Sequence, residues 1–134
     1  LHLSIRRQRQ MCIRDRLIPA VEVRLRGFYR LLPPDYYEAA DNLADFCDRI
    51  EKQYGVRPVI YCTERTYKNI VASDSRFNKD KIWYESLFSK PDEDMNWTFW
   101  TYTNRVKFSF YESGEYLHMT VFNGSEDDFK KLIL

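Results

Sequence analysis

In residues 35–62 the chain reads DYYEAADNLADFCDRIEKQYGVRPVIYC, and the order of the secondary structure can be worked out from this stretch. Its apolar residues recur at alternating steps of four and three, which predicts a helix over about 35–54 with one buried face. They are Tyr36, Ala40, Leu43, Cys47, Ile50 and Tyr54. Asp35 is suited to cap this helix, and Gly55 is suited to end it in a left-handed conformation. The apolar run within 56–62 predicts a short buried strand.

Further strands and helices are predicted on both sides of this stretch. The apolar run Leu17–Val23 predicts a buried strand, and Thr63 is suited to begin a brief helix that continues to about Val71. Other strands are predicted over 82–88, 97–103, 107–111 and 116–122. A last short helix follows Ser125. Strands that alternate with helices indicate a parallel sheet with crossover helices, and strands close in sequence can pair antiparallel. We therefore expect an α/β fold.

The composition is that of a globular protein with a core. Of the 134 residues, 44% are hydrophobic and 16% are aromatic, which excludes a disordered chain. No apolar run approaches the roughly 18 residues of a membrane-spanning helix. Cys47 and Cys62 are not spaced as a pair of metal ligands, so we expect both to be small core residues. Without a glycine-rich phosphate loop, a serine elbow or a histidine pair, the sequence predicts neither a metal nor a cofactor.

The first 16 residues differ from the rest of the chain. They contain five arginines and one acid, Asp15, and they show neither a helical period nor a strand alternation. The part from Met11 to Asp15 resembles a translated sequencing-library adapter, so we interpret residues 1–16 as a non-native segment outside the fold. A disordered native arm is the alternative. Nucleic-acid binding is the least favoured interpretation, because no aromatic residue stands between the arginines to stack on bases.

Polar and aromatic residues gather at the predicted strand ends. In a parallel α/β sheet the carboxyl ends of the strands lie along one edge, where such folds hold their functional groups. The residues at these ends are Glu22, Arg24, Tyr61, Tyr84, Glu85, Trp100, Tyr102 and His118. Aromatic rings with scattered polar groups suit sugars, whose C–H faces are apolar while their hydroxyls need hydrogen-bond partners. The alternatives are that the aromatic residues fill the core and that His118 is structural.

Five segments of the chain, taken in order, resemble a known family. They are PAVEV (19–23), GVRPVIY (55–61), IW (82–83), WTFWTYT (97–103) and VFNGS (121–125). Together they resemble glycoside hydrolase family 25, the lysozyme-like N-acetylmuramidases that cut the glycan of bacterial peptidoglycan. The resemblance extends over nearly all of residues 17–134.

The resemblance implies a fold and a place within it. The family has a modified TIM-like barrel, in which five strand–helix units are followed by three largely antiparallel strands. The predicted elements match its second half, so residues 17–134 are expected to be the C-terminal part of a (β/α)5β3 barrel. The first strand of the family, with its active-site aspartate, is then expected upstream of this chain.

The resemblance also implies catalytic residues, and this chain departs from them. The family usually carries Asp-x-Glu where this chain has Glu22 and Arg24, so Arg24 stands at the position of the general acid. An arginine stays protonated and cannot give a proton to the leaving oxygen, whereas a glycosidase of this type normally needs two carboxyl groups. The chain also has Thr101 where the family usually has Gln, and His118 where it usually has Asp. The residues at the strand ends that are expected to bind substrate are Tyr61, Tyr84, Trp100, Tyr102 and His118.

Two functions follow as expectations. The first is the family's hydrolysis of peptidoglycan glycan strands during cell-wall breakdown, in a secreted or wall-associated protein. We expect this chain itself to be inactive, because Arg24 replaces the general acid and the N-terminal part of the barrel is missing. The second is a non-catalytic domain that binds cell-wall glycan, or serves as a scaffold, on a degenerate barrel. We also expect low solubility, since a half barrel leaves strand edges unpaired.

Overall fold

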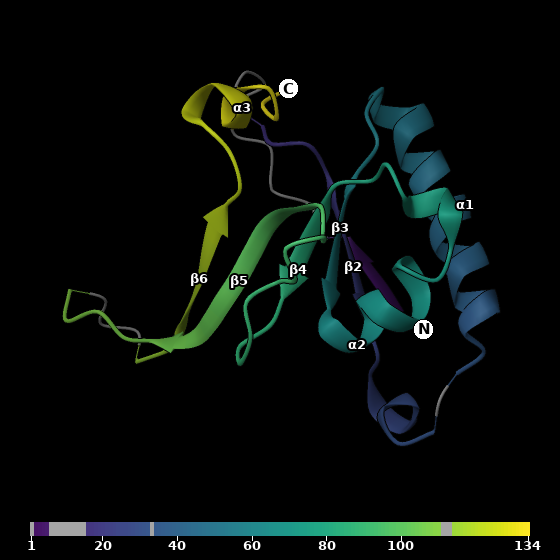
Figure 1. Cartoon of the computed structure of the whole chain (residues 1–134), viewed down its shortest axis with the longest axis horizontal. Helices are drawn as coiled ribbons and strands as arrows, with labels where there is room; N and C mark the ends of the chain where they lie inside the picture. The colour runs from purple at the N-terminus through teal and green to yellow at the C-terminus, as the bar shows by residue number, and fades with distance from the viewer. Residues whose placement is uncertain (1, 6–15, 33, 111–113) are drawn as a thin grey trace.

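A mixed six-stranded sheet forms the centre of the protein (Figure 1). The computed structural model describes residues 2–5, 16–32, 34–110 and 114–134. The strands lie side by side in sequence order: β1 (His2–Ile5), β2 (Ala20–Arg24), β3 (Val59–Thr63), β4 (Ile82–Glu85), β5 (Trp97–Val106) and β6 (Leu117–Phe122). The strands from β2 to β5 are parallel, whereas β1 and β6 are each antiparallel to their neighbour. The predicted α/β class is confirmed.

Helices connect β2 to β3 and β3 to β4, whereas a loop without a helix connects β4 to β5. Helix α1 (Tyr36–Tyr54) joins β2 to β3. The connection from β3 to β4 contains α2 (Glu64–Thr66), the π-helical turn η2 (Tyr67–Val71) and the 3-10 turn η3 (Ser75–Phe77). Two further short elements are η1 (Gly27–Arg30), after β2, and α3 (Glu126–Lys130), after β6. The side chain of Asp35 accepts hydrogen bonds from the N–H groups of Tyr37 and Glu38, and Gly55 ends α1 with a φ of 75°. The predicted helix and both of its ends are confirmed.

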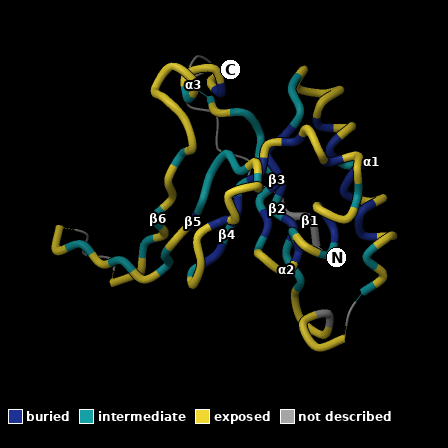
Figure 2. The backbone as a smooth tube through the Cα atoms, viewed as in Figure 1, coloured by how far each residue is buried: buried dark blue, intermediate teal, exposed yellow. Residues whose placement is uncertain are grey.

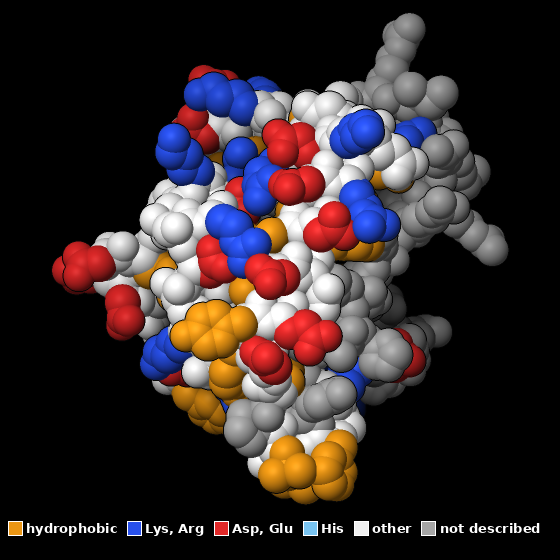
Figure 3. Space-filling view, turned by 90° about the vertical axis from the view of Figure 1, so that its right-hand side faces the viewer, with side chains coloured by type: hydrophobic (Ala, Val, Ile, Leu, Met, Phe, Trp, Pro, Cys, Tyr) orange, Lys and Arg blue, Asp and Glu red, His pale blue; other side chains and the backbone are white. Residues whose placement is uncertain are grey.

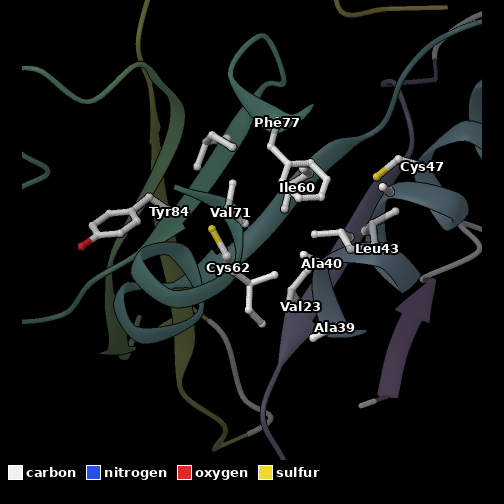
Figure 4. Close-up of a cluster of buried hydrophobic side chains, with 14 residues drawn as sticks. Val23, Ala39, Ala40, Leu43, Cys47, Ile60, Cys62, Val71, Phe77 and Tyr84 are labelled. Carbon is white, nitrogen blue, oxygen red and sulfur yellow. The ribbon is translucent and has the colours of Figure 1, made fainter. Parts of the chain in front are cut away.

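The core lies between α1 and one face of the sheet (Figure 2). Successive side chains of a strand point to opposite faces, so only alternate residues of β2, β3 and β4 enter this core. Figure 4 shows Leu43 and Cys47 of α1 in the same cluster as Ile60 of β3, and all three are fully buried. Cys47 and Cys62 are buried core residues, as predicted. Burial raises the pKa of the Cys47 thiol to about 12, which makes this thiol unreactive at neutral pH.

The outward side of α1 is covered by mixed acidic and basic side chains (Figure 3). Arg49 pairs with Asp45 one turn earlier in the helix, at 2.9 Å. Arg57, which follows the helix, contacts Asp48 of α1 at 2.7 Å and also the buried carboxylate of Asp80, which precedes β4. Arg57 therefore ties the end of α1 to the segment that leads into β4.

Several strand boundaries differ from the prediction. β2 begins at Ala20 and not at residue 17, because Leu17 forms an isolated bridge with Ile133 near the C-terminus. β4 ends at Glu85, before the predicted end at residue 88. Residues 107–110 form no strand, since β5 continues to Val106 and pairs with β6 directly. Residue 111, the end of the strand predicted there, lies outside the described residues.

The N-terminal segment takes part in the sheet, although the sequence analysis placed all of residues 1–16 outside the fold. β1 pairs antiparallel with β2, with the Cα atoms of Ser4 and Glu22 opposite each other. The edge strand of a sheet has unpaired N–H and C=O groups that can pair with any extended backbone. The pairing of β1 with β2 therefore does not require an alternation of apolar and polar residues in β1. Residues 6–15 lie outside the described residues, and the origin of the segment stays a prediction.

The packing of α1 on the sheet gives a first prediction. Leu43→Ala should lower the free energy of unfolding by about 2 to 5 kcal/mol, because it removes a fully buried side chain and leaves a cavity. Urea titration, monitored by circular dichroism, measures the change in the free energy of unfolding. Leu31→Ala, at a residue that is 82% exposed, is the control and should cost less than about 0.5 kcal/mol. Equal losses for the two variants would contradict the packing described.

Candidate functional site

One face of the sheet carries a row of aromatic residues and one acid. Strand pairing aligns Glu22 with Tyr61, Tyr61 with Trp83, Trp83 with Phe99, and Phe99 with Phe122. Aligned residues on neighbouring strands point to the same face, so these five side chains share one face. We call it the aromatic face. It is opposite to the face that α1 covers.

The rings on the aromatic face touch from strand to strand. The ring centres are 5.0 Å apart for Tyr61 and Trp83, 5.2 Å for Trp83 and Phe99, and 5.4 Å for Phe99 and Phe122. Trp83 Nε1 donates a hydrogen bond to the hydroxyl of Thr101 at 2.8 Å, which fixes the indole in the row. All four rings are half-buried, so part of each stays accessible.

A charged cluster lies at the carboxyl ends of β2, β3 and β4, and it consists of Glu22, Arg24, Tyr61 and Glu85. Arg24 Nη2 donates to Glu85 Oε2 at 2.9 Å. Arg24 Nε lies 2.7 Å from Glu22 Oε1, as an ion pair without the alignment of a hydrogen bond. The Tyr61 hydroxyl donates to the same oxygen of Glu85. A single guanidinium therefore bridges two carboxylates.

The electrostatics of the charged cluster keep Arg24 charged and Tyr61 protonated. Partial burial alone lowers the pKa of Arg24, but the charges of Glu85 and Glu22 outweigh burial, and the pKa is raised overall. Burial, followed by the hydrogen bond to Glu85, raises the pKa of Tyr61. Neither group releases a proton near neutral pH. The position of Arg24 therefore holds a permanent cation.

The predicted row of site residues is divided between the two faces. Glu22, Arg24 and Tyr61 meet in the charged cluster, whereas Tyr84 is only 5% exposed and belongs to the core under α1. Trp100 aligns with Tyr84, packs against that core and donates Nε1 to the carbonyl of Ser86 at 3.0 Å. The expectation of one shared rim is therefore wrong for Tyr84 and Trp100, because strand alternation turns them away from Tyr61.

The other two predicted residues lie apart from the charged cluster. Tyr102 is 40% exposed, and its ring centre is 5.7 Å from that of Trp100. His118 is exposed at the start of β6, and three strands, β3 to β5, separate it from the strand of Glu22 in the sheet order. Among the described residues, no hydrogen bond or ion pair joins His118 to the charged cluster.

Trp83 was not among the predicted site residues, and Glu85 was named at a strand end without being given a role. Both alternate with the buried Ile82 and Tyr84 along β4, so they must face away from the core. Glu85 also stands at a strand end next to Tyr84. The signal was therefore present in the sequence, but the partner of Glu85 could be found only once β2 and β4 were seen on either side of β3.

An open pocket of about 880 Å³ adjoins the charged cluster. We call it the arginine pocket, and the residues that line it include Arg24, Arg26, Arg30, Thr63, Arg65 and Glu85.

The described residues contain no group of three or more His, Cys, Asp or Glu side chains that is placed to hold a metal ion. No described helix has the length and apolar character needed to cross a membrane.

Comparison with known proteins gives consistent results. The model of the family described as glycosyl hydrolases family 25 matches residues 31–109, a range that contains Tyr61 and Glu85 but not Glu22 and Arg24. The solved structure of a family 25 glycosyl hydrolase from Bacillus anthracis is similar, with a TM-score of 0.74 and 28% sequence identity. The similarity covers 88% of this chain and 55% of the other, so this chain spans about half the length of that protein. No curated protein matches the chain.

The bridge between Arg24 and Glu85 gives a second prediction. In a double-mutant cycle, Arg24→Met and Glu85→Met should show a coupling energy of about 1 to 3 kcal/mol, because each change leaves the partly buried partner without its counter-charge. Free energies of unfolding from urea titration supply the cycle. The exposed pair of Arg49 and Asp45 is the control, and its coupling should be about 0.5 kcal/mol or less. Equal coupling in both cycles would contradict the bridge.

Tyr84 gives a third prediction, on the pH dependence of stability. Burial is the main reason that its pKa is raised from 10.0 to about 12. Between these two values the unfolded chain has lost the phenolic proton while the folded chain retains it, so the free energy of unfolding falls as the pH rises. Tyr84→Phe should make this fall shallower in unfolding experiments across that range. Tyr37→Phe, at a residue that is 87% exposed, should leave it unchanged. A wild-type slope in Tyr84→Phe would exclude this contribution.

Proposed function

Since the chain belongs to glycosyl hydrolases family 25, we propose that its aromatic face and charged cluster form a binding surface for the glycan of bacterial peptidoglycan. For a protein that carries the complete fold, family membership supports lysozyme-like hydrolysis of this glycan, as an N-acetylmuramidase, during cell-wall breakdown. The place of action that fits this substrate is the bacterial cell wall, reached by a secreted or wall-associated protein.

We infer that the sheet is the second half of a modified (β/α)5β3 barrel. The parallel strands β2 to β5, followed by antiparallel β6, support this inference, as does the similarity to 55% of the Bacillus anthracis protein. In this interpretation the aromatic face is the inside of the barrel. The charged cluster then lies at the carboxyl ends of the strands, where barrel enzymes hold their reactive groups. β1 occupies the edge of β2 at which a preceding barrel strand would pair.

The bridging guanidinium of Arg24 is the observation that carries the proposal for this chain. Arg24 takes the position at which the family resemblance puts the general acid, and its charge is held by Glu22 and Glu85. A leaving oxygen at that position finds no proton to accept, so the step that breaks the glycosidic bond is not assisted. We therefore propose that this chain binds the glycan without cleaving it. Glu22 then serves as a hydrogen-bond acceptor for sugar hydroxyls.

The aromatic row supports binding. Half-buried rings that lie side by side offer apolar surface to the C–H faces of successive sugars, while the charged cluster supplies polar partners at one end. Tyr61 belongs to both, since its ring stands in the row and its hydroxyl in the cluster. Of the other predicted binding residues, Tyr84 has no accessible surface to offer. His118 remains a proposed contact at the far end of the same surface.

A fourth prediction tests binding and cleavage together. The full chain should sediment with purified peptidoglycan and should release no reducing sugar, as followed by turbidity and by a reducing-end assay. Tyr61→Ala combined with Trp83→Ala should weaken binding by about tenfold, because each ring contact is worth about 0.5 to 1.5 kcal/mol. Circular dichroism checks that the variant is folded.

Trp100→Ala combined with Tyr102→Ala is the matched control, since both rings lie outside the aromatic row. This variant should bind like the wild type. Binding that depends on Trp100 and Tyr102 but not on Tyr61 and Trp83 would move the site to the other face. Release of reducing ends by the unmodified chain would show that Arg24 does not prevent cleavage.

A further inference from the structure

The arginine pocket collects positive charge next to the charged cluster. Four arginines line it, Arg24, Arg26, Arg30 and Arg65, against a single carboxylate, that of Glu85. They come from three places in the fold, since Arg24 ends β2, Arg26 and Arg30 belong to the loop with η1, and Arg65 belongs to α2. A cluster assembled from separate elements is a property of the folded chain and not of one basic stretch of sequence.

The positive charge in the pocket is only partly balanced. Arg24 takes up the charge of Glu85, and Arg26 lies 4.0 Å from the other oxygen of Glu22 with a side chain that is 59% exposed. Arg65 donates to the backbone carbonyl of Arg30 at 2.9 Å, which holds the two residues together but supplies no negative charge. Neither Arg30 nor Arg65 forms an ion pair with any described residue.

An anion in the pocket removes this imbalance. Like charges that line one concave surface repel each other, and the resulting positive potential attracts negative ligands. Guanidinium groups hydrogen-bond carboxylate and phosphate oxygens in a two-point geometry, and such charge-assisted bonds are stronger than neutral ones.

We propose that the arginine pocket binds an oxyanion, a carboxylate or a phosphate group, of the cell-wall polymer whose glycan lies on the aromatic face. The identity of the polymer rests on the proposed function, whereas the anion site itself rests on Arg30, Arg65 and the pocket. Glu85 connects the two sites, because it lines the pocket and also accepts the hydrogen bond from Tyr61. Carboxylates of peptide stems and phosphates of attached polymers are the two sources that this chemistry allows.

Calorimetric titration of the full chain with inorganic phosphate, and separately with glutarate, tests the anion site without any glycan. The wild type should bind at least one of the two, and Arg30→Gln combined with Arg65→Gln should lose about tenfold or more in affinity. Arg49→Gln removes an arginine of the same charge from the outer side of α1 and should bind like the wild type. If the double variant does not fold, Arg30→Gln alone, in the exposed η1 loop, takes its place. No binding by the wild type, or equal binding by the arginine-pocket variant, overturns the proposal.

Sedimentation with peptidoglycan separates this proposal from the proposed function and distinguishes the two sources. Hydrofluoric acid removes phosphodiester-linked polymers from the walls. If the ligand is a phosphate, the wild type and the Arg30 and Arg65 variant should bind the treated walls equally. If the ligand is a carboxylate, the wild type should still bind them more tightly than the variant. Anion binding without any peptidoglycan binding would support the pocket and contradict the glycan surface. Peptidoglycan binding that is unchanged in the Arg30 and Arg65 variant, together with no anion binding, would support the glycan surface and contradict the anion site.

Discussion

Helix α1 and the segment from α2 to η3 cover one face of β2, β3 and β4, and this contact fixes the direction of every other side chain on those strands. Val21, Ile60 and Ile82 are buried in the core on that face, so their neighbours in sequence must point to the opposite face. A shift of one residue in any strand would bring polar groups into the core, which makes the register firm. The charged cluster exists because this register places Glu22, Tyr61 and Glu85 on the same side of the sheet.

Within that framework one guanidinium, that of Arg24, pairs with both carboxylates of the charged cluster. Arg24 brings a cation to a position where the family resemblance leads one to expect an acid, and Glu85, two strands away, supplies the opposite charge. Tyr61 completes the arrangement, since its hydroxyl donates a hydrogen bond to Glu85. A partly buried arginine without Glu85 would be costly. The two residues are therefore best understood as one unit, and the arginines of the adjoining pocket as charge that this unit does not neutralise.

Local patterns carried much of the prediction. The helical spacing in residues 35–54, with Asp35 and Gly55 at its ends, was sufficient for α1, and the alternation of strands and helices was sufficient for the parallel order. Glu22, Arg24 and Tyr61 do lie close together, as the pattern of strand ends predicted, and their role as site residues stays a proposal. Tyr84 and Trp100 were misplaced because nearness to a strand end was given more weight than the side to which each residue points. Glu85 as the partner of Arg24, and the pairing of β1 with β2, depend on contacts across the sheet that no local pattern contains.

The backbone bonds between residues 16–18 and 132–134 have a consequence for how the fold comes apart. Ile18 donates to the carbonyl of Leu132 at 2.9 Å, and Leu134 donates to that of Arg16 at 2.6 Å, so the entry into β2 and the exit from α3 are fastened to each other. Phe129 of α3 in turn packs on Phe122 of β6. Fraying of residues 132–134 therefore loosens residues 16–18, although the two segments lie far apart in the sequence. Because of these bonds, residues 16–18 and 132–134 are expected to unfold together. The two segments are also close enough in space for a short peptide linker to join them.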